Sequence, residues 1–325
     1  MAVKQNITFL SSDKKITIYG IEWIPEKEPY LGVIQITHGM IEFKERYEET
    51  ADFLADKGFI VIVCDQLGHG DSVTSVKKRG YFSDKPGCDC LIRDMHQIRI
   101  YGQTKYKGLP YILLGHSMGS FLTRTYIEKY GKGLAGVILA GTGWIPSAAA
   151  GAGLMLLRFM AVRCGWHYHS SFAEKLIFSS GYEKYDMSGT KPEESWLTRD
   201  TEIARAYYAN PKSQFKFSLN GFYGLVDAVC YANDPVFMKQ IPKNLPILLI
   251  SGGEDPLGNY GKGTKRVEHM MKRAGVKNVC TAIYIGARHE VLNELNRQQV
   301  WEEITDWCKK EVLKISGEKN GVDSK

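Results

Sequence analysis

YILLGHSMGSFLTRTYIEKY occupies residues 111–130 and combines an apolar run, the pentapeptide GHSMG at residues 115–119, and an amphipathic segment. This pattern predicts a strand, a sharp turn and a helix that begins at about Met118. Glycine is expected at both ends of the pentapeptide, because the turn gives the serine a positive φ and brings strand and helix too close for a Cβ atom. Ser117 is therefore predicted to be a nucleophile at the tip of the turn, where the helix dipole and free N–H groups face a developing oxyanion.

The size and composition of the chain indicate one large domain with an insertion, because 325 residues with 44% hydrophobic content can bury a substantial core. The polar segment 315–325 is predicted to be a disordered tail. The N-terminal sequence MAVKQNITFLSSDKK has neither the apolar core nor the small-residue cleavage site of a signal peptide. A cytoplasmic location is therefore expected.

The charged and metal-binding residue types argue against nucleic-acid and metal sites. The net charge is +6, but basic residues are scattered among acidic ones, and the tight triplet Lys77-Lys78-Arg79 has no interleaved aromatic residue. His167 and His169 have no accompanying carboxylate or cysteine cluster. No nucleic-acid partner and no metal are expected. Free thiols are predicted for the seven cysteines, which show no paired metal spacing and lie at positions 64, 88, 90, 164, 230, 280 and 308.

Strand-like and helical segments alternate along most of the chain. Apolar runs without clean alternation indicate strands covered on both faces, and the alternation with helices indicates a mainly parallel sheet with right-handed crossovers. The predicted fold class is therefore α/β in three layers. The predicted strands are Ile16–Trp23, Leu31–Thr37, Phe59–Asp65, Tyr111–Leu114, Leu134–Ala140, Ile247–Ser251 and Val279–Ile285, and the predicted helices are 44–57, 88–106, 118–130, 259–274 and 293–314.

The segment 142–232 interrupts this alternation. It contains no convincing strand but includes helical stretches at Ala148–Arg163 and Thr201–Ala209. We interpret it as a helical cap over the carboxyl edge of the sheet, inserted between core segments 1–141 and 233–314. The stretch Ala148–Val162 is almost wholly apolar, but a membrane span needs about 20 such residues. A cap helix is therefore the preferred interpretation.

A serine nucleophile needs a base, and the base needs an acid that orients it. Asp255 is the predicted acid, because it directly follows the apolar strand 246–250 and so lies at the carboxyl edge of the sheet. Glu254 is the nearest alternative, and Asp227 and Asp234 are weaker ones. His289 is the predicted base, since it follows the last strand and precedes the last helix.

The oxyanion hole needs two backbone donors. The predicted donors are the N–H groups of Met118, which follows the nucleophile, and Met40, which lies in the turn after the strand Leu31–Thr37. The glycine in His38-Gly39-Met40 permits a tight turn there.

Together these motifs resemble the α/β-hydrolase superfamily and, within it, the monoacylglycerol lipase and lysophospholipase group, also named serine aminopeptidase-like hydrolases. The resemblance covers about residues 15–312 and rests on THGMIE at 37–42 with Arg46-Tyr47, DQLGHGDS at 65–72, the serine turn, Asp255 and His289, in that order. The group typically has His where Phe43 stands and His or a similar residue at Gln66, so this sequence departs at both positions.

The resemblance implies hydrolysis of an acyl or lipid ester through an acyl-enzyme, without a cofactor. It also implies that cap residues shape the acyl site and that the cap makes transient contact with a membrane surface. A Leu/Met stripe on a helix is also typical of plain packing, so both interpretations stay open for these side chains. The predicted apolar wall consists of Leu154, Met155, Leu157, Phe159, Met160 and Trp166.

Other functions are compatible with the same residues. A small-ester esterase, an amidase or peptidase, an acyltransferase or a thioesterase would use the same serine, histidine and aspartate. A non-catalytic binding protein on this fold should have lost one of the three residues, and all three are present. Dinucleotide binding is disfavoured because no GxGxxG motif follows a strand.

Overall fold

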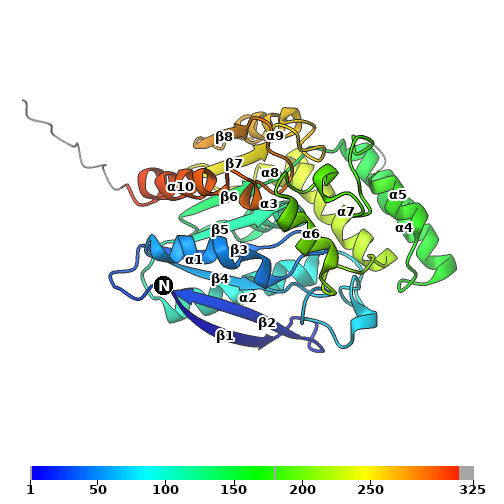
Figure 1. The fold of residues 1–325 in the computed structure, drawn as a ribbon, viewed down its shortest axis with the longest axis horizontal. Helices are drawn as coiled ribbons and strands as arrows, with labels where there is room; N and C mark the ends of the chain where they lie inside the picture. Colours follow the sequence, from blue (N-terminus) through cyan, green and yellow to red (C-terminus); the bar gives the residue numbers. More distant parts are fainter. Residues whose placement is uncertain (1, 179–180, 315–325) are drawn as a thin grey trace, which may run out of the picture.

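The computed structural model describes residues 2–178 and 181–314, and it is built on one eight-stranded sheet (Figure 1). The predicted tail at 315–325 lies outside the described residues. Five strands are buried along their whole length and are mostly apolar, as expected for strands covered on both faces. They are β3, β4, β5, β6 and β7. The strands are β1 (Val3–Leu10), β2 (Thr17–Ile24), β3 (Gly32–Thr37), β4 (Phe59–Cys64), β5 (Tyr111–His116), β6 (Gly136–Ala140), β7 (Ile247–Gly252) and β8 (Val279–Tyr284).

The strand order is β1-β2-β4-β3-β5-β6-β7-β8. The pairs from β4 to β8 are parallel, whereas β1–β2 and β2–β4 are antiparallel. The predicted mainly parallel sheet is confirmed, but β1 was missed. Its sequence VKQNITFL is mostly exposed and has no apolar run, because β1 is an edge strand held by its register with β2.

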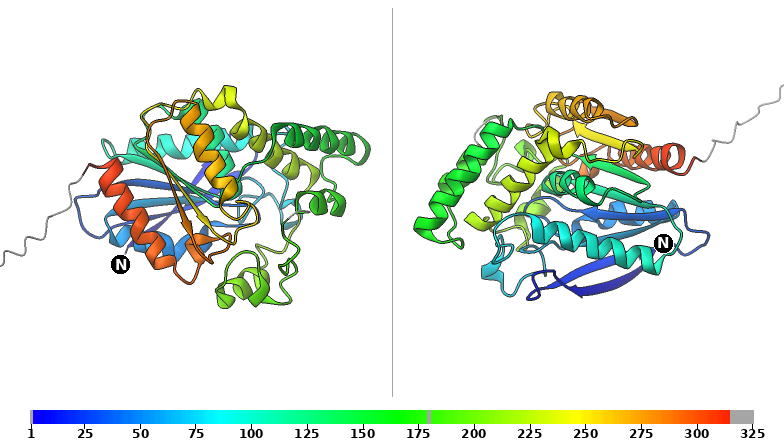
Figure 2. Two further views of the ribbon diagram at one scale, coloured as in Figure 1. Left: turned by 90° about the horizontal axis from the view of Figure 1, so that it is seen from above. Right: turned by 180° about the vertical axis from the view of Figure 1, so that it is seen from behind.

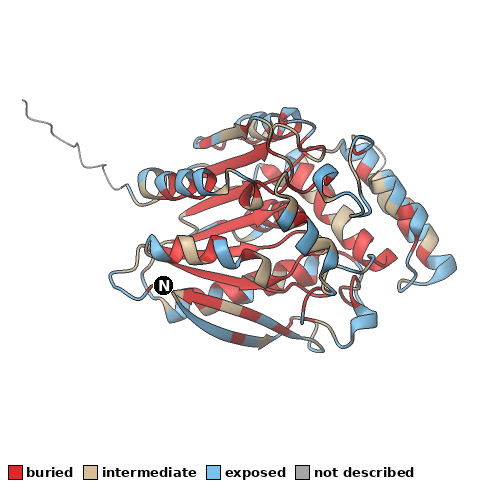
Figure 3. Ribbon diagram, viewed as in Figure 1, coloured by how far each residue is buried: buried red, intermediate tan, exposed pale blue. Residues whose placement is uncertain are grey.

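Helices cover both faces of the sheet (Figure 2). One face packs on α1 (Glu48–Asp56) and α10 (Arg297–Trp307), and the other packs on α2 (Asp89–Lys105), α3 (Met118–Tyr130) and α9 (Lys262–Arg273). In β5, Ile112 and Leu114 join the first core, while Tyr111 and Leu113 join the second, as a two-residue period requires. Figure 3 shows the resulting buried sheet between partly exposed helices. The fold is the three-layer α/β arrangement that the sequence predicted.

Short helices modify the predicted boundaries. The 3-10 helix η1 (Lys44–Tyr47) precedes α1, η2 (Val76–Lys78) lies in the loop after β4, and η4 (Val291–Asn293) precedes α10. The predicted helix 259–274 starts later, at Lys262, because Asn259, Tyr260 and Gly261 have positive φ angles. The predicted helix 293–314 is α10 followed by the π-helical turn η5 (Cys308–Val312).

Between β6 and β7 the chain leaves the sheet and forms a helical insertion, residues 142–232 (Figure 1). Helix α7 (Leu219–Asn233) packs against both α3 and α4 (Ser147–Cys164), so it lies between the sheet layers and the outermost helices. Helix α4 has mean hydropathy 1.3 over its 18 residues, and by length and composition it could cross a membrane. The insertion contains α4 (Ser147–Cys164), α5 (Ser171–Ile177), η3 (Pro192–Glu194), α6 (Thr201–Ala209) and most of α7 (Leu219–Asn233); α8 (Pro235–Met238) follows it.

Arg124 on α3 fastens the two ends of this insertion. Its guanidinium donates to the carbonyl of Gly143 (3.0 Å) at the entry, and to the carbonyl of Ala232 (2.5 Å) and Oδ1 of Asn233 (2.7 Å) at the exit. The side chain is fully buried, and burial lowers its pKa to about 10. One side chain thus joins the helix behind Ser117 to both stems of the insertion.

Replacing Arg124 with Met should destabilise the protein, because it leaves several buried carbonyl oxygens without donors. We expect a loss of about 3 kcal/mol in the free energy of unfolding, measured by urea denaturation. The matched control is Arg158→Met on the exposed face of α4, which should change the free energy by less than about 0.5 kcal/mol. Equal losses in both variants would contradict this role of Arg124.

Candidate active site

The turn between β5 and α3 has the conformation that the sequence predicted. Ser117 has φ 53° and ψ −119°, and α3 begins at the next residue, Met118. A Cβ on Gly115 would lie 2.4 Å from the Gly119 carbonyl oxygen, and a Cβ on Gly119 would lie 2.0 Å from the Thr37 carbonyl oxygen. Both glycines are therefore required by close backbone approach. A positive φ at a serine is strained, and such strain is typical of functional sites.

His289 and Asp255 lie together at the carboxyl edge of the sheet. Nδ1 of His289 is 3.0 Å from Oδ1 of Asp255, and both side chains are almost fully buried. The same Asp255 oxygen accepts the Leu257 N–H (2.9 Å), which holds the carboxylate in place. Among the described residues, no well-aligned hydrogen bond reaches either ring nitrogen of His289. Such bonds often tighten only when substrate binds.

Glu254, the nearest alternative acid, has a different environment. Its carboxylate pairs with Lys184 at the surface, where both side chains are about half exposed. The geometry therefore brings Asp255, and not Glu254, to the imidazole of His289.

The turn after β3 lies directly against the serine turn. A Cβ on Gly39 would meet Cβ of Ser117 at 3.0 Å and Oε2 of Glu42 at 2.5 Å, so only glycine fits. Ile41 in the same turn has φ 58°, an uncommon conformation for a β-branched residue. Met40 lies between Gly39 and Ile41 in this turn. The N–H of Met118, in the first turn of α3, has no intrahelical partner.

Glu42 joins the Gly39 turn to the serine turn. Its Oε2 accepts hydrogen bonds from the Gly39 N–H (2.6 Å) and the Tyr47 hydroxyl (2.9 Å), and it lies 2.8 Å from Nδ1 of His116. Its Oε1 pairs with Arg46. The carboxylate is buried and contacts groups on three different segments, so it is the centre of a polar cluster behind the nucleophile.

Arg46 extends this cluster to the histidine loop. Its guanidinium binds both carboxylate oxygens of Glu290, at 2.8 and 2.7 Å, next to His289 in the sequence. The ring of Tyr207 from the insertion covers the guanidinium at 4.6 Å. A bidentate pair of this kind fixes geometry as well as charge.

The buried charged groups around Glu42 shift one another's pKa values. Burial acts to raise the pKa of Glu42, but His116 and Arg46 outweigh burial, so the pKa lies well below its ordinary value. Burial acts to lower the pKa of His116, but the Glu42 carboxylate raises it above the ordinary value. Glu42 is therefore an anion that favours a protonated His116.

Gln66, a departure from the group's usual pattern, holds His38 at the start of the Gly39 turn. Its backbone N–H donates to Nε2 of His38 (2.9 Å), and its side-chain amide donates to the His38 carbonyl oxygen (2.6 Å). Burial lowers the pKa of His38, so the ring is held as a neutral acceptor. Phe43, the other departure, is buried, and Lys212 of the insertion lies over its ring at 5.5 Å.

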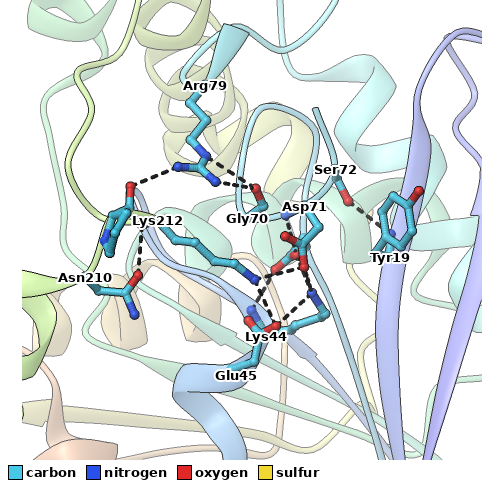
Figure 4. Close-up of polar contacts among 11 residues, drawn as sticks. Tyr19, Lys44, Glu45, Gly70, Asp71, Ser72, Arg79, Asn210 and Lys212 are labelled. Atoms are coloured by element: carbon cyan, nitrogen blue, oxygen red, sulfur yellow. Dashed lines mark hydrogen bonds and ion pairs between the residues drawn. The ribbon is translucent and has the colours of Figure 1, made fainter. Parts of the chain in front are cut away.

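Lys212 ties the insertion to the core on this side (Figure 4). Its ammonium lies 3.0 Å from Glu45 and 2.9 Å from Asp71, and Lys44 also binds Asp71 at 2.5 Å. Arg79 donates to the carbonyl oxygen of Pro211 (2.9 Å). The loops after β3 and β4 therefore hold the segment of the insertion that directly follows α6.

The six residues of the predicted apolar wall differ in burial and in their contacts. Leu157 is buried, and it lines a small apolar pocket between α4, α5 and α7 together with Met160. Met155 and Phe159 are 76% and 60% exposed, so they do not line a buried wall. Helix α4 is apolar on its outer face as well, and the role of these side chains in an acyl site stays a prediction. Leu154 is half-buried, and Trp166 packs edge-on against Tyr223 of α7.

Comparison with known proteins places the chain in a family. Residues 28–296 match the family of serine aminopeptidase, S33. The monoacylglycerol lipase of Mycolicibacterium smegmatis is 25% identical over 286 residues, which cover 88% of this chain and 90% of that protein. The monoglyceride lipase homolog of monkeypox virus is 26% identical over 293 residues, 89% and 93% of the two chains.

Solved structures agree with this relationship. A thermostable carboxyl esterase from Bacillus coagulans, crystallised with glycerol, has TM-score 0.87 and 27% identity, covering 96% of this chain and 100% of that one. A monoglyceride lipase from Saccharomyces cerevisiae, bound to a substrate analog, has TM-score 0.75 and 17% identity, covering 95% of each chain, and shows the fold alone. The chain has the α/β-hydrolase fold. It belongs to the serine aminopeptidase S33 family, as the sequence motifs indicated.

Replacing Glu42 with Gln should weaken the polar cluster in a pH-dependent way. Because the pKa of Glu42 is lowered by folding, its stabilisation is present above its ordinary value of 4.5 and lost as pH falls. Because the pKa of His116 is raised by folding, the stabilisation that its charge contributes is complete below 6.5 and declines as pH rises through the raised value. The difference in free energy of unfolding between wild type and variant should therefore be largest between these values, at about 3 kcal/mol.

Urea denaturation at acidic, intermediate and alkaline pH measures this difference. Glu49→Gln is the control, because Glu49 is exposed and pairs only with Arg297 among the contacts described. It should change stability by less than about 1 kcal/mol at any of these pH values. A Glu42→Gln effect that is constant across the range would argue against the charge pairing with His116.

Proposed function

We propose that the protein is a serine hydrolase of carboxylic esters in which Ser117 is the nucleophile, His289 the base and Asp255 the orienting acid. The observation that carries the proposal is the convergence of three loops. The strained serine turn, the His289–Asp255 pair at 3.0 Å and the Gly39 turn against Ser117 all lie at one edge of the sheet. This is the arrangement that acyl transfer by a serine requires.

Each residue has a defined step in this mechanism. Nε2 of His289 takes the proton of the Ser117 hydroxyl as Oγ attacks the ester carbonyl, and Asp255 stabilises the imidazolium. The N–H groups of Met40 and Met118 bind the oxyanion. The imidazolium then protonates the leaving alcohol, giving an acyl-enzyme. Water, deprotonated by the neutral His289, releases the acid and restores Ser117. No cofactor is needed.

The proposed substrates are monoacylglycerols or similar lipid esters with one acyl chain. Relatives named monoacylglycerol lipase align along most of the chain, which supports this choice. An acyl chain gains up to about 0.8 kcal/mol for each methylene that an apolar site buries. A small apolar pocket between α4, α5 and α7 is lined by Gly153, Leu156, Leu157, Met160, Ala173, Leu176, Ile177 and Val226.

Variants of the three residues test the mechanism with a monoacylglycerol and a p-nitrophenyl ester. Ser117→Ala and His289→Ala should each remove nearly all turnover, and Asp255→Asn should lower kcat by about 10⁴ because it favours the wrong histidine tautomer. Glu254→Gln is the matched control and should lower kcat much less. A large loss in Glu254→Gln with a small loss in Asp255→Asn would identify Glu254 as the orienting acid instead.

The same assays identify the substrate class. Wild-type kcat/KM should be higher for medium or long acyl esters than for acetate esters, thioesters or aminoacyl amides. A preference for aminoacyl amides would replace the lipase proposal with the peptidase alternative, while leaving the roles of the three residues intact.

We further propose that the insertion, residues 142–232, is a cap that touches lipid surfaces through α4 and α5. Large apolar side chains on these helices are exposed. They are Met155 (76%), Phe159 (60%), Val162 (80%), Phe172 (60%) and Leu176 (47%). An exposed apolar patch of this kind marks an interaction site. A lipid interface suits it because the proposed substrate is held in one.

The double variant Met155→Asp/Phe159→Asp should bind phosphatidylcholine vesicles less well than wild type in a flotation assay. Insertion of each side chain contributes about 1.5–3 kcal/mol, so hydrolysis of vesicle-borne monoacylglycerol should fall at least about tenfold. Hydrolysis of a soluble p-nitrophenyl ester should stay within about twofold. Val76→Asp, at an exposed apolar residue of η2, is the control. Equal losses on both substrates would indicate damage to the catalytic site.

A further inference from the structure

A tryptophan from the insertion lies on the face of the imidazole of His289. The ring centroids of Trp196 and His289 are 4.6 Å apart, and the ring planes are inclined by only 26°. The ring of His116 is also near, at 5.0 Å and 46°. The imidazole therefore contacts one ring from β5 and one ring from the insertion.

Backbone hydrogen bonds hold Trp196 in register with the histidine loop. The His289 N–H donates to the Trp196 carbonyl oxygen (3.3 Å), and the Glu290 N–H donates to the Leu197 carbonyl oxygen (2.7 Å). The Arg288 side chain also donates to the Thr198 carbonyl oxygen (3.2 Å). The segment around Trp196 is thus fixed by the same loop that carries His289, and not by α4.

Further aromatic rings support the indole from behind. Tyr182 lies 5.2 Å from Trp196 at 76°, and Phe178 lies 6.0 Å away at 59°. Tyr182 is buried and close to Asp255, and burial raises its pKa far above the ordinary value. It therefore stays neutral, and it adds no charge beside the Asp255–His289 pair.

The charged groups around His289 come from several elements. Asp255 follows β7 and lies on the edge of the ring, while His116, at the end of β5, is paired with Glu42. Glu290 is paired with Arg46, and Arg288 is directed toward carbonyl oxygens of the insertion. The indole of Trp196 is the neutral, polarisable surface that lies against the ring of His289.

We propose that Trp196 is a positioning residue that favours the imidazolium form of His289 during acyl transfer. The inference rests on the proposed function, in which the proton of the Ser117 hydroxyl moves to Nε2 of His289 as the Oγ–carbon bond forms. The positive charge then lies over the indole face, within the distance at which tryptophan attracts a cation. A neutral imidazole gains less from the same face, so the contact strengthens as the proton arrives.

The experiment compares Trp196→Leu, Trp196→Phe and Phe178→Leu with wild type. The readouts are the rate of covalent labelling by a small fluorophosphonate and kcat/KM for p-nitrophenyl acetate, both across a pH series. Neither probe needs a long acyl site, so changes report on the serine and histidine. Phe178→Leu is the matched control, because that ring contacts Trp196 but is not described in contact with His289.

Trp196→Leu should slow labelling about two- to thirtyfold and move the acidic limb of the pH profile down by about 0.4–1.5 pH units. Trp196→Phe should lie between Leu and wild type, since phenylalanine offers a weaker aromatic face. Phe178→Leu should leave the acidic limb in place. Unfolding midpoints of all variants identify any loss that comes from misfolding, and Trp196→Phe remains informative if Trp196→Leu does not fold.

Three outcomes would overturn the inference. The first is that Trp196→Leu changes neither the labelling rate nor the acidic limb of the pH profile. The second is slower labelling with an unmoved acidic limb, which indicates that Trp196 acts by packing alone. The third is faster labelling, which indicates that the indole obstructs the site. Failure of the proposed function is distinguishable, because Ser117→Ala or His289→Ala would then retain labelling whatever residue stands at position 196.

Discussion

The close backbone approach between α3 and the end of β3 is the constraint on which the rest of the site depends. Gly119 lies so near the carbonyl oxygens of Thr37 and His38 that no side chain fits. This approach places the Gly39 turn against Ser117 and imposes the positive φ of the serine. Without it, the backbone donors and the nucleophile would lie on separate loops with no fixed relation.

The polar cluster around Glu42 converts that contact into a rigid site. One carboxylate binds the Gly39 turn and His116, and Arg46 continues the contacts to Glu290 beside His289. Burial makes these contacts strong, and it also makes the loss of any partner costly. The insertion joins the same framework through Trp196, so the proposed cap and the three loops form one structure around His289.

The sequence predicted the parts that depend on local patterns. The apolar strands, the serine turn and helix α3 follow from runs and glycine spacing, and all three are observed. Strand β1 could not be predicted, because an exposed edge strand carries no apolar run. Trp196 and Arg124 gave no local signal either, since their partners lie far away in the chain. The outward face of α4 could not be predicted either, because an apolar helix shows no clear periodicity.

The most direct test of the central claim is to find which residue a fluorophosphonate modifies in the wild-type protein. Peptide mass spectrometry after labelling and digestion identifies that residue. One adduct per chain, on the peptide that contains Ser117, is the result that follows from the strained turn beside His289 and the Gly39 loop. An adduct on another serine, or an unlabelled but folded protein, would contradict the assignment of Ser117 as the nucleophile.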